Sequence, residues 1–84
     1  MYRNIYIVKP TLRKVNLTLT KNRLKEFRAK GKLSQEKLAD LASVSRQTVI
    51  SIEGGRFTPS LELALKFAKL FKCKVEDIFD IKEG

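Results

Sequence analysis

The chain contains 84 residues, of which 43% are hydrophobic, and it has a formal net charge of +9, one cysteine and no histidine. This length provides one domain with a single core, and the composition excludes an internal disulfide and argues against metal and general-base chemistry. No apolar run approaches the ~20 residues of a membrane span, and no secretory signal is evident. We therefore expect a reduced, cytoplasmic protein without a cofactor, a metal or a membrane partner, in which Cys73 is a buried or half-buried apolar residue.

The positive charge is concentrated in the first part of the chain. Residues 1–37 contain eleven Lys or Arg residues and two acids, whereas residues 38–84 contain seven of each kind. A basic excess confined to one region indicates a polyanionic partner. We expect nucleic acid rather than an anionic membrane, because no predicted helix has a basic face opposite a broad exposed apolar face.

Residues 1–20 form a basic N-terminal arm or a short β element. Val15, Leu17 and Leu19 alternate with polar residues, which predicts a strand, and a looser alternation precedes Pro10. We expect one or two short strands here, forming either a hairpin or an edge that pairs between subunits. The alternative is a flexible basic tail that adds only nonspecific attraction.

Residues 21–80 carry the apolar spacing of helices, and the predicted fold class is all-α. We expect five helices, at about residues 21–30, 34–41, 46–53, 61–71 and 75–79. Thr20 or Asn22 is expected to cap the first helix, and Gly31 to end it in the left-handed conformation. Residues 81–84 are assigned to a C-terminal tail.

The predicted fourth helix is apolar around most of its circumference. Its polar residues form one stripe, namely Glu62, Lys66 and Lys69. An arc this wide predicts that neighbouring helices cover this helix on most sides, so that it is the spine of the core. Apolar surface left over near Ile78, Phe79 and Ile81 is the first candidate for a dimer contact.

The segment from residue 33 to residue 53 predicts two short amphipathic helices joined by a tight turn. Ser34 and Ser45 stand where N-caps are needed, and each follows an apolar residue that can pack five positions later, on Leu38 or Val49. This is the spacing of a helix-turn-helix, whose second helix enters the DNA major groove. The alternative is a helical hairpin that serves packing alone.

The outer face of the second of these helices favours DNA reading. With Val49 and Ile52 turned inward, four residues point outward, and we expect them to contact bases: Arg46, Gln47, Ile50 and Ser51. Arg and Gln side chains form bidentate hydrogen bonds with guanine and adenine edges, and an apolar group suits the thymine methyl. An exposed isoleucine beside them is otherwise hard to explain on a small domain.

Residues from about 22 to 79 resemble the Cro and phage-repressor type of helix-turn-helix regulators, the Xre family. The segments that match, in order and with the family's spacing, include Leu33-Ser34-Gln35-Glu36-Lys37-Leu38-Ala39, Val44-Ser45-Arg46-Gln47-Thr48-Val49 and Val75-Glu76-Asp77-Ile78-Phe79. The resemblance implies a five-helix, lambda-repressor-like DNA-binding domain. There is one departure, because Ser43 occupies the turn position usually held by Gly. A positive φ at Ser43 would cost on the order of 1 kcal/mol relative to Gly.

The resemblance also implies roles for residues outside the reading face. It pairs Arg28 with Glu53 in a structural salt bridge, and it makes Gln35 a brace between the DNA backbone and the reading helix. Gln35 stands in the first turn of a helix, where backbone amides and the helix dipole favour a phosphate. The residues that we expect to contact phosphates are Gln35, Lys37, Ser45, Thr48 and Arg56.

Together these features predict a sequence-specific DNA-binding transcriptional regulator. Residues 46–53 would enter the major groove of double-stranded DNA, and the protein would bind a palindromic operator as a homodimer, since one short helix reads few bases. The alternative is an antitoxin-type protein-interaction module, in which the N-terminal strand or the C-terminal tail holds a partner protein and DNA binding is secondary. An enzyme is not expected, because no paired-carboxylate, metal-ligand or nucleophile–base pattern is present.

Overall fold

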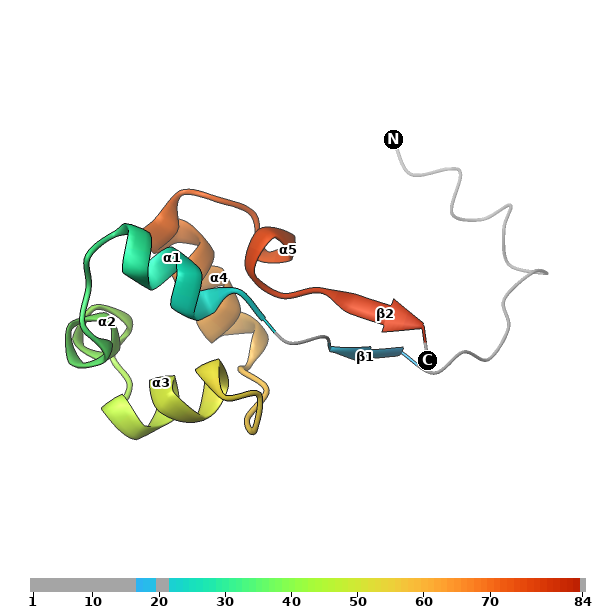
Figure 1. Ribbon diagram of the computed structural model, residues 1–84, viewed down its shortest axis with the longest axis horizontal. Helices are drawn as coiled ribbons and strands as arrows, with labels where there is room; N and C mark the ends of the chain where they lie inside the picture. Colours follow the sequence, from blue (N-terminus) through green and yellow to red (C-terminus); the bar gives the residue numbers. More distant parts are fainter. Residues whose placement is uncertain (1–16, 20–21, 84) are drawn as a thin grey trace.

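The computed structural model of the protein describes residues 17–19 and 22–83, and within them the chain forms five helices and two short strands (Figure 1). In chain order these are β1 (Leu17–Leu19), α1 (Leu24–Lys30), α2 (Gln35–Ala42), α3 (Arg46–Glu53), α4 (Leu61–Phe71), α5 (Val75–Ile78) and β2 (Ile81–Glu83). The expected five-helix, all-α class is confirmed. None of the helices in the described part of the chain is long and apolar enough to cross a membrane.

Serine caps begin three of the helices. The hydroxyls of Ser34, Ser45 and Ser60 accept hydrogen bonds from the backbone N–H groups three residues further on, at 3.0, 3.1 and 3.1 Å. Each bond satisfies an amide that the first turn of a helix leaves without an intrahelical partner. α1 begins at Leu24, later than the expected residue 21, and Asn22 Oδ1 accepts from the Leu24 N–H at 3.0 Å.

Four helices end in the same backbone motif. A residue with positive φ donates its N–H to the carbonyl three residues back, and the next N–H bonds to the carbonyl five residues back. The positive-φ residues are Lys32, Ser43, Gly55 and Lys72, with φ of 57°, 60°, 78° and 54°. The expectation that Gly31 is left-handed is wrong: its φ is −82°, because its N–H closes the last turn of α1 on the Phe27 carbonyl. The left-handed position therefore falls one residue later, at Lys32.

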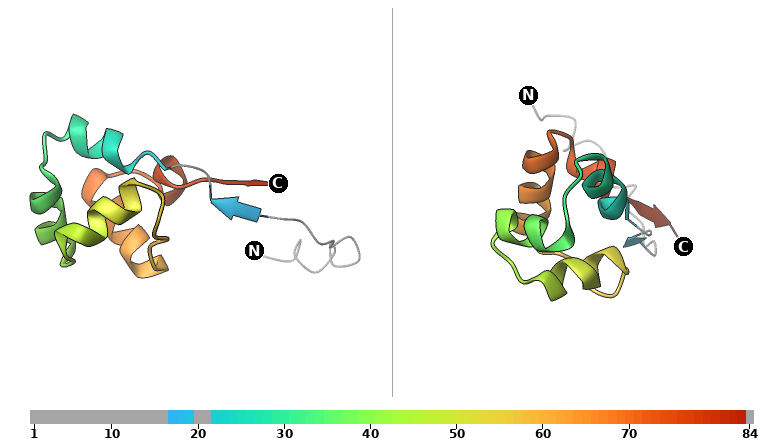
Figure 2. Two further views of the ribbon diagram at one scale, coloured as in Figure 1. Left: turned by 60° about the horizontal axis from the view of Figure 1, so that its bottom comes forward. Right: turned by 60° about the vertical axis from the view of Figure 1, so that its left-hand side comes forward.

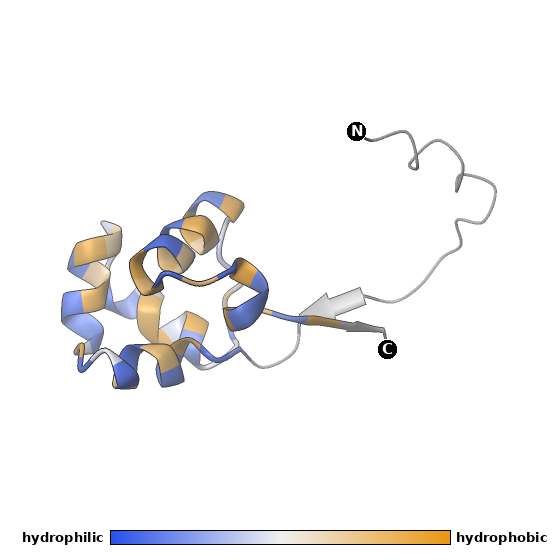
Figure 3. Ribbon diagram, turned by 90° about the horizontal axis from the view of Figure 1, so that it is seen from above, coloured by the Kyte–Doolittle hydropathy of each residue, from blue (hydrophilic) through white to orange (hydrophobic). Residues whose placement is uncertain are grey.

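The core lies where α4 meets the other helices. α2 packs against α3 and α4, α1 against α3, and α5 against α4, and Figure 3 shows hydrophobic and hydrophilic residues alternating around the helices. The Phe67 and Phe79 ring centroids are 6.4 Å apart, and both residues are buried, as is Ile78. Ile78 and Phe79 therefore belong to the core and leave no apolar surface for the expected dimer contact, which would have to rest on Ile81. Ile81 is 55% exposed.

The expectation that α4 is covered on most sides is also wrong. Its inward face, with Leu63, Ala64, Phe67 and Ala68, is buried, but its other three leucines, Leu61, Leu65 and Leu70, are exposed. The apolar arc of α4 is wider than the surface that four short neighbouring helices cover. The hydropathy pattern of a helix shows which of its residues favour burial. Whether those residues are buried depends on how many other helices pack against that helix.

A two-stranded antiparallel sheet extends from the helices (Figure 2). β1 pairs with β2 in the register Leu17↔Glu83, Thr18↔Lys82 and Leu19↔Ile81. An N-terminal strand is thus present, and among the described residues it pairs with the C-terminal segment of the same chain. Assigning residues 81–84 to a tail did not anticipate this strand. The looser alternation before Pro10 lies outside the described residues.

Arg23 connects the start of α1 to the end of α5. Its backbone N–H bonds to the Ile78 carbonyl at 2.9 Å, and its guanidinium donates to the carbonyls of Asp77, at 2.7 Å, and Glu76, at 3.2 Å. The guanidinium thus meets carbonyls that the end of α5 leaves without helical partners. These bonds hold the start of α1 against the end of α5.

Candidate nucleic-acid interface

A close crossing of α2 and α3 builds the central unit. Ala39 is buried on α2, and its carbonyl accepts a hydrogen bond of 2.9 Å from the Val44 N–H in the turn. A side chain of one carbon at this position lets the two helices approach each other closely. Val49 and Ile52 of α3 are fully buried. The inner face of α3 is therefore fixed in the core, and its opposite face is directed outward.

A partly buried ion pair fixes the carboxyl end of α3. Arg28 Nε donates to Glu53 Oε2 at 2.6 Å and Arg28 Nη2 to Glu53 Oε1 at 3.3 Å, with side-chain exposures of 15% and 6%. Arg28 Nη1 also donates to the Leu33 carbonyl at 2.9 Å, and Gln35 Nε2 donates to Glu53 Oε1 at 3.1 Å. This is the pairing that the family resemblance implies. One carboxylate thus connects α1, the start of α2 and the end of α3.

The outward face of α3 presents the residues predicted to read bases. Arg46 and Gln47 are exposed, and Ile50 and Ser51 are partly exposed. Gln47 Nε2 lies 3.4 Å from Ser51 Oγ, so these two side chains form one polar surface a single helical turn long. The face combines groups that suit guanine or adenine edges with one apolar group that suits a thymine methyl.

Two hollows border α3 and gather most of the residues predicted to contact phosphates. One lies between α3, α1 and α2, and it includes Lys25, Gln35 and Arg46. The other lies between α3 and the loop that follows it; the predicted residues that it brings together are Ser45, Thr48 and Arg56. Lys37 is exposed on α2 and lines neither hollow. Polar and basic groups on both sides of a reading helix suit the two phosphate strands that border a groove.

The sequence from residue 24 to residue 78 matches the family model described as helix-turn-helix. The chain belongs to the Cro- and phage-repressor-type helix-turn-helix family. Proteins of this family are DNA-binding transcriptional regulators and not enzymes, and this one shares their fold and their helix-turn-helix.

Three similar proteins illustrate the relationship. An uncharacterized HTH-type transcriptional regulator of Methanocaldococcus jannaschii is 58% identical over 59 residues, which are 70% of this chain and 89% of that protein. The uncharacterized HTH-type transcriptional regulator YgzD of Bacillus subtilis is 52% identical over 63 residues, or 75% and 96%. The restriction-modification controller protein C.AhdI of Aeromonas hydrophila superposes with a TM-score of 0.61 at 36% identity, covering 66% of this chain and 83% of that one.

This Cro-type domain has an unusual residue in its helix-turn-helix turn. Ser43 takes the left-handed conformation, with φ 60° and ψ 45°. A side chain raises the energy of this conformation by roughly 1–2 kcal/mol relative to Gly, and the greater freedom of Gly in the unfolded chain offsets part of that difference.

Ser43→Gly is therefore expected to raise the free energy of unfolding by about 0.5–1 kcal/mol, measured by urea denaturation. Gly55, with φ 78° and open space where a Cβ would lie, is the matched control. Gly55→Ala should lower the stability, because alanine is strained at positive φ. If Ser43→Gly were neutral or destabilising, the Ser43 hydroxyl would be contributing more to this Cro-type turn than its backbone strain removes.

The sequence analysis missed two residues that shape this Cro-type interface. Asn22 Nδ2 donates to the Ile52 carbonyl at 2.8 Å, so a residue considered only as a cap also holds the end of α3. Phe57 is 49% exposed beside Arg56 and lines the hollow at Gln47 and Ser51. An aromatic residue in a polar loop, with no apolar neighbour at helical spacing, was a signal that could have identified Phe57.

Cys73 behaves in this Cro-type domain as the sequence analysis expected. It is half-buried and packs against the core. Desolvation, together with the nearby carboxylate of Asp77, raises the pKa of the Cys73 thiol above its ordinary value. The thiol is therefore protonated at neutral pH and serves as a small apolar side chain.

Proposed function

We propose that the protein regulates transcription in the cytoplasm by inserting α3 into the major groove of a specific operator. The outward face of α3 carries the proposal: its inner face is fixed by the core and by Glu53, while Arg46, Gln47, Ile50 and Ser51 face away from the domain. Arg46 and Gln47 are the proposed readers of base edges, with Ile50 and Ser51 beside them.

The phosphate contacts are proposed to come from both sides of α3. Gln35 and Lys37 on α2 would meet one strand, and Ser45, Thr48 and Arg56 the other. Ser45 Oγ and Thr48 Oγ1 are hydrogen-bonded to each other at 2.9 Å, which holds the two hydroxyls together at the start of the reading helix. Such contacts would position the domain and supply most of its affinity, whereas the base contacts would supply sequence preference.

We also propose that two copies bind a palindromic operator. α3 has eight residues, so one copy presents about two turns of helix to the DNA. Doubling the site by two-fold symmetry increases the number of bases read without a longer helix. The antitoxin alternative required β1 or the C-terminal segment to hold a partner protein. Because β1 and β2 pair with each other, we do not propose it.

Selection of bound fragments from a random-sequence DNA library tests this function. We expect enrichment of an inverted repeat whose half-site centres lie about 10–10.5 base pairs apart, or a multiple of that spacing. The Arg46→Ala/Gln47→Ala double variant is the matched control, and it should enrich no motif. Bound fragments without a common motif would overturn base-specific reading. Enrichment of one unrepeated half-site would overturn the dimer.

A further inference from the structure

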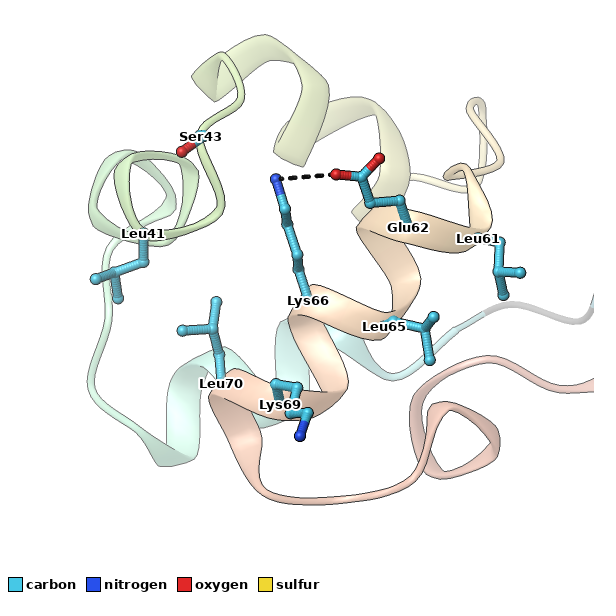
Figure 4. Close-up of a pocket in the computed structure, with 8 residues that line it drawn as sticks. All are labelled: Leu41, Ser43, Leu61, Glu62, Leu65, Lys66, Lys69 and Leu70. Carbon is cyan, nitrogen blue, oxygen red and sulfur yellow. Dashed lines mark ion pairs between the residues drawn. The ribbon is translucent and has the colours of Figure 1, made fainter.

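Four leucines form an exposed groove on the side of the domain made by α2 and α4. Leu61 is 73% exposed, Leu65 50%, Leu41 47% and Leu70 37%. They line a single open groove of about 580 Å³, which we call the leucine groove (Figure 4). Scattered exposed leucines are ordinary on a protein surface, but a contiguous apolar surface marks a site of interaction.

The leucine groove is separate from the proposed DNA-binding surface. It shares no lining residue with either hollow beside α3. Its own polar residues are Ser43 and the polar stripe of α4, which consists of Glu62, Lys66 and Lys69. A molecule bound here would leave Arg46 and Gln47 free to contact DNA.

The shape of the groove suits a helix. It lies between two helices, and in Figure 4 Leu41 of α2 and Leu70 of α4 lie on one side of the Lys66 side chain while Leu61 and Leu65 lie on the other. An amphipathic helix binds such a surface by placing residues of one apolar stripe against it.

The charges in the groove define the chemistry of that helix. Lys66 Nζ lies 3.8 Å from Glu62 Oε2 on the exposed surface, and Lys69 extends into the same groove. An adjoining hollow shares Leu65 and Lys69 with the leucine groove and adds three charged residues, namely Lys72, Lys74 and Glu76. This side of the domain therefore has four lysines and two glutamates, and its net charge is positive. An occupant must place negative charge among its apolar residues.

A second copy of the chain does not meet this requirement. Two-fold pairing through the groove would apply the same surface to itself and bring the net positive charge of this side of one copy against that of the other. Like charges placed together at an interface are unfavourable. We propose that the leucine groove binds an acidic amphipathic helix of another protein, so that the domain can hold DNA and a protein partner at the same time.

The test uses two synthetic helical peptides and the full chain. Both peptides carry leucines at positions i, i+4 and i+7; one has glutamates at the intervening exposed positions, and the other has lysines. In fluorescence-anisotropy titrations we expect the glutamate peptide to bind and the lysine peptide not to bind. Leu65→Ser should weaken binding of the glutamate peptide by about tenfold or more. Lys66→Glu/Lys69→Glu should weaken the glutamate peptide and favour the lysine peptide.

Phe57→Ser is the matched control, because Phe57 is exposed to the same extent as Leu65 but lies outside the groove. It should leave peptide binding unchanged. Circular dichroism verifies that each variant is folded, which is expected because Leu65 is half exposed. Operator selection with Leu65→Ser should give the wild-type motif, so failure of the peptide test and failure of the proposed DNA reading are distinguishable.

Three results would overturn the proposal. Equal binding of the two peptides would show that charge does not select the partner. Tight binding of the glutamate peptide to Leu65→Ser would show that the leucine groove is not the binding site. Sedimentation equilibrium provides the third: a wild-type dimer that Leu65→Ser converts to a monomer would show that a second copy occupies the groove.

Discussion

Replacing Glu53 with alanine is expected to lower the free energy of unfolding by about 2–4 kcal/mol, because it leaves a partly buried guanidinium without its counter-charge. Arg28 is 15% exposed, and it would lose two hydrogen bonds to the carboxylate. Gln35 would lose its acceptor as well. Urea denaturation followed by circular dichroism measures the change, provided that the slope of the unfolding free energy against urea concentration is the same as in the wild type.

A double-mutant cycle separates the pair from its surroundings. Arg28→Ala/Glu53→Ala should be less destabilised than the sum of the two single variants, because neither charge remains buried alone. The exposed pair of Glu62 and Lys66 is the matched control, and Glu62→Ala should change stability by less than about 1 kcal/mol. Strict additivity of the Arg28 and Glu53 variants would contradict the structural role assigned to the pair.

Replacing Arg46 or Gln47 with alanine is expected to weaken binding to the selected operator by about 1–3 kcal/mol, and to leave binding to unrelated DNA almost unchanged. A bond to a base edge contributes only where the correct base is present, so its loss reduces specificity more than general affinity. Titration of each variant against the operator and against a scrambled sequence of the same length measures both quantities. Unchanged preference in both variants would mean that α3 does not read the sequence.

Arg56→Ala is the control for this experiment. Arg56 is exposed in the loop after α3 and is proposed to contact a phosphate. Its removal should weaken binding to operator and scrambled DNA alike, and should lower the slope of log affinity against log salt concentration by about one unit. A loss confined to the operator would instead place Arg56 among the base-reading residues.

The parts of the fold that depend on local chemistry could be predicted from the sequence. The bounds of α3 follow from the Ser45 cap and from the spacing of Val49 and Ile52, and the structure reproduces them. Hydrogen bonds between residues three to five positions apart are determined by few residues, so a short motif is sufficient to identify them. The Arg28–Glu53 pair spans 25 positions, and only resemblance to a known family indicated it.

The parts that depend on distant segments could not be predicted in this way. β2 contains three residues, Ile81–Glu83, too few to show an alternation, and it pairs with a strand more than sixty positions earlier in the chain. The bonds of Arg23 to the carbonyls at the end of α5 also join residues more than fifty positions apart. The exposure of Leu61 and the burial of Phe79 likewise depend on how many neighbours each helix has in three dimensions.

The anchoring of α3 at both ends has a consequence for how much binding free energy would be lost on a DNA site with a wrong base pair. The turn holds its beginning through the Ala39 carbonyl, while Asn22 and Glu53 hold its end. If α3 is the reading helix, as proposed, it is preorganised, and little conformational entropy would be lost when it enters the groove. Within the domain, such a helix would resist tilting toward a wrong base pair. The penalty for a mismatch would then appear as unsatisfied hydrogen-bonding groups, so that rigidity of the protein would contribute to discrimination between DNA sequences.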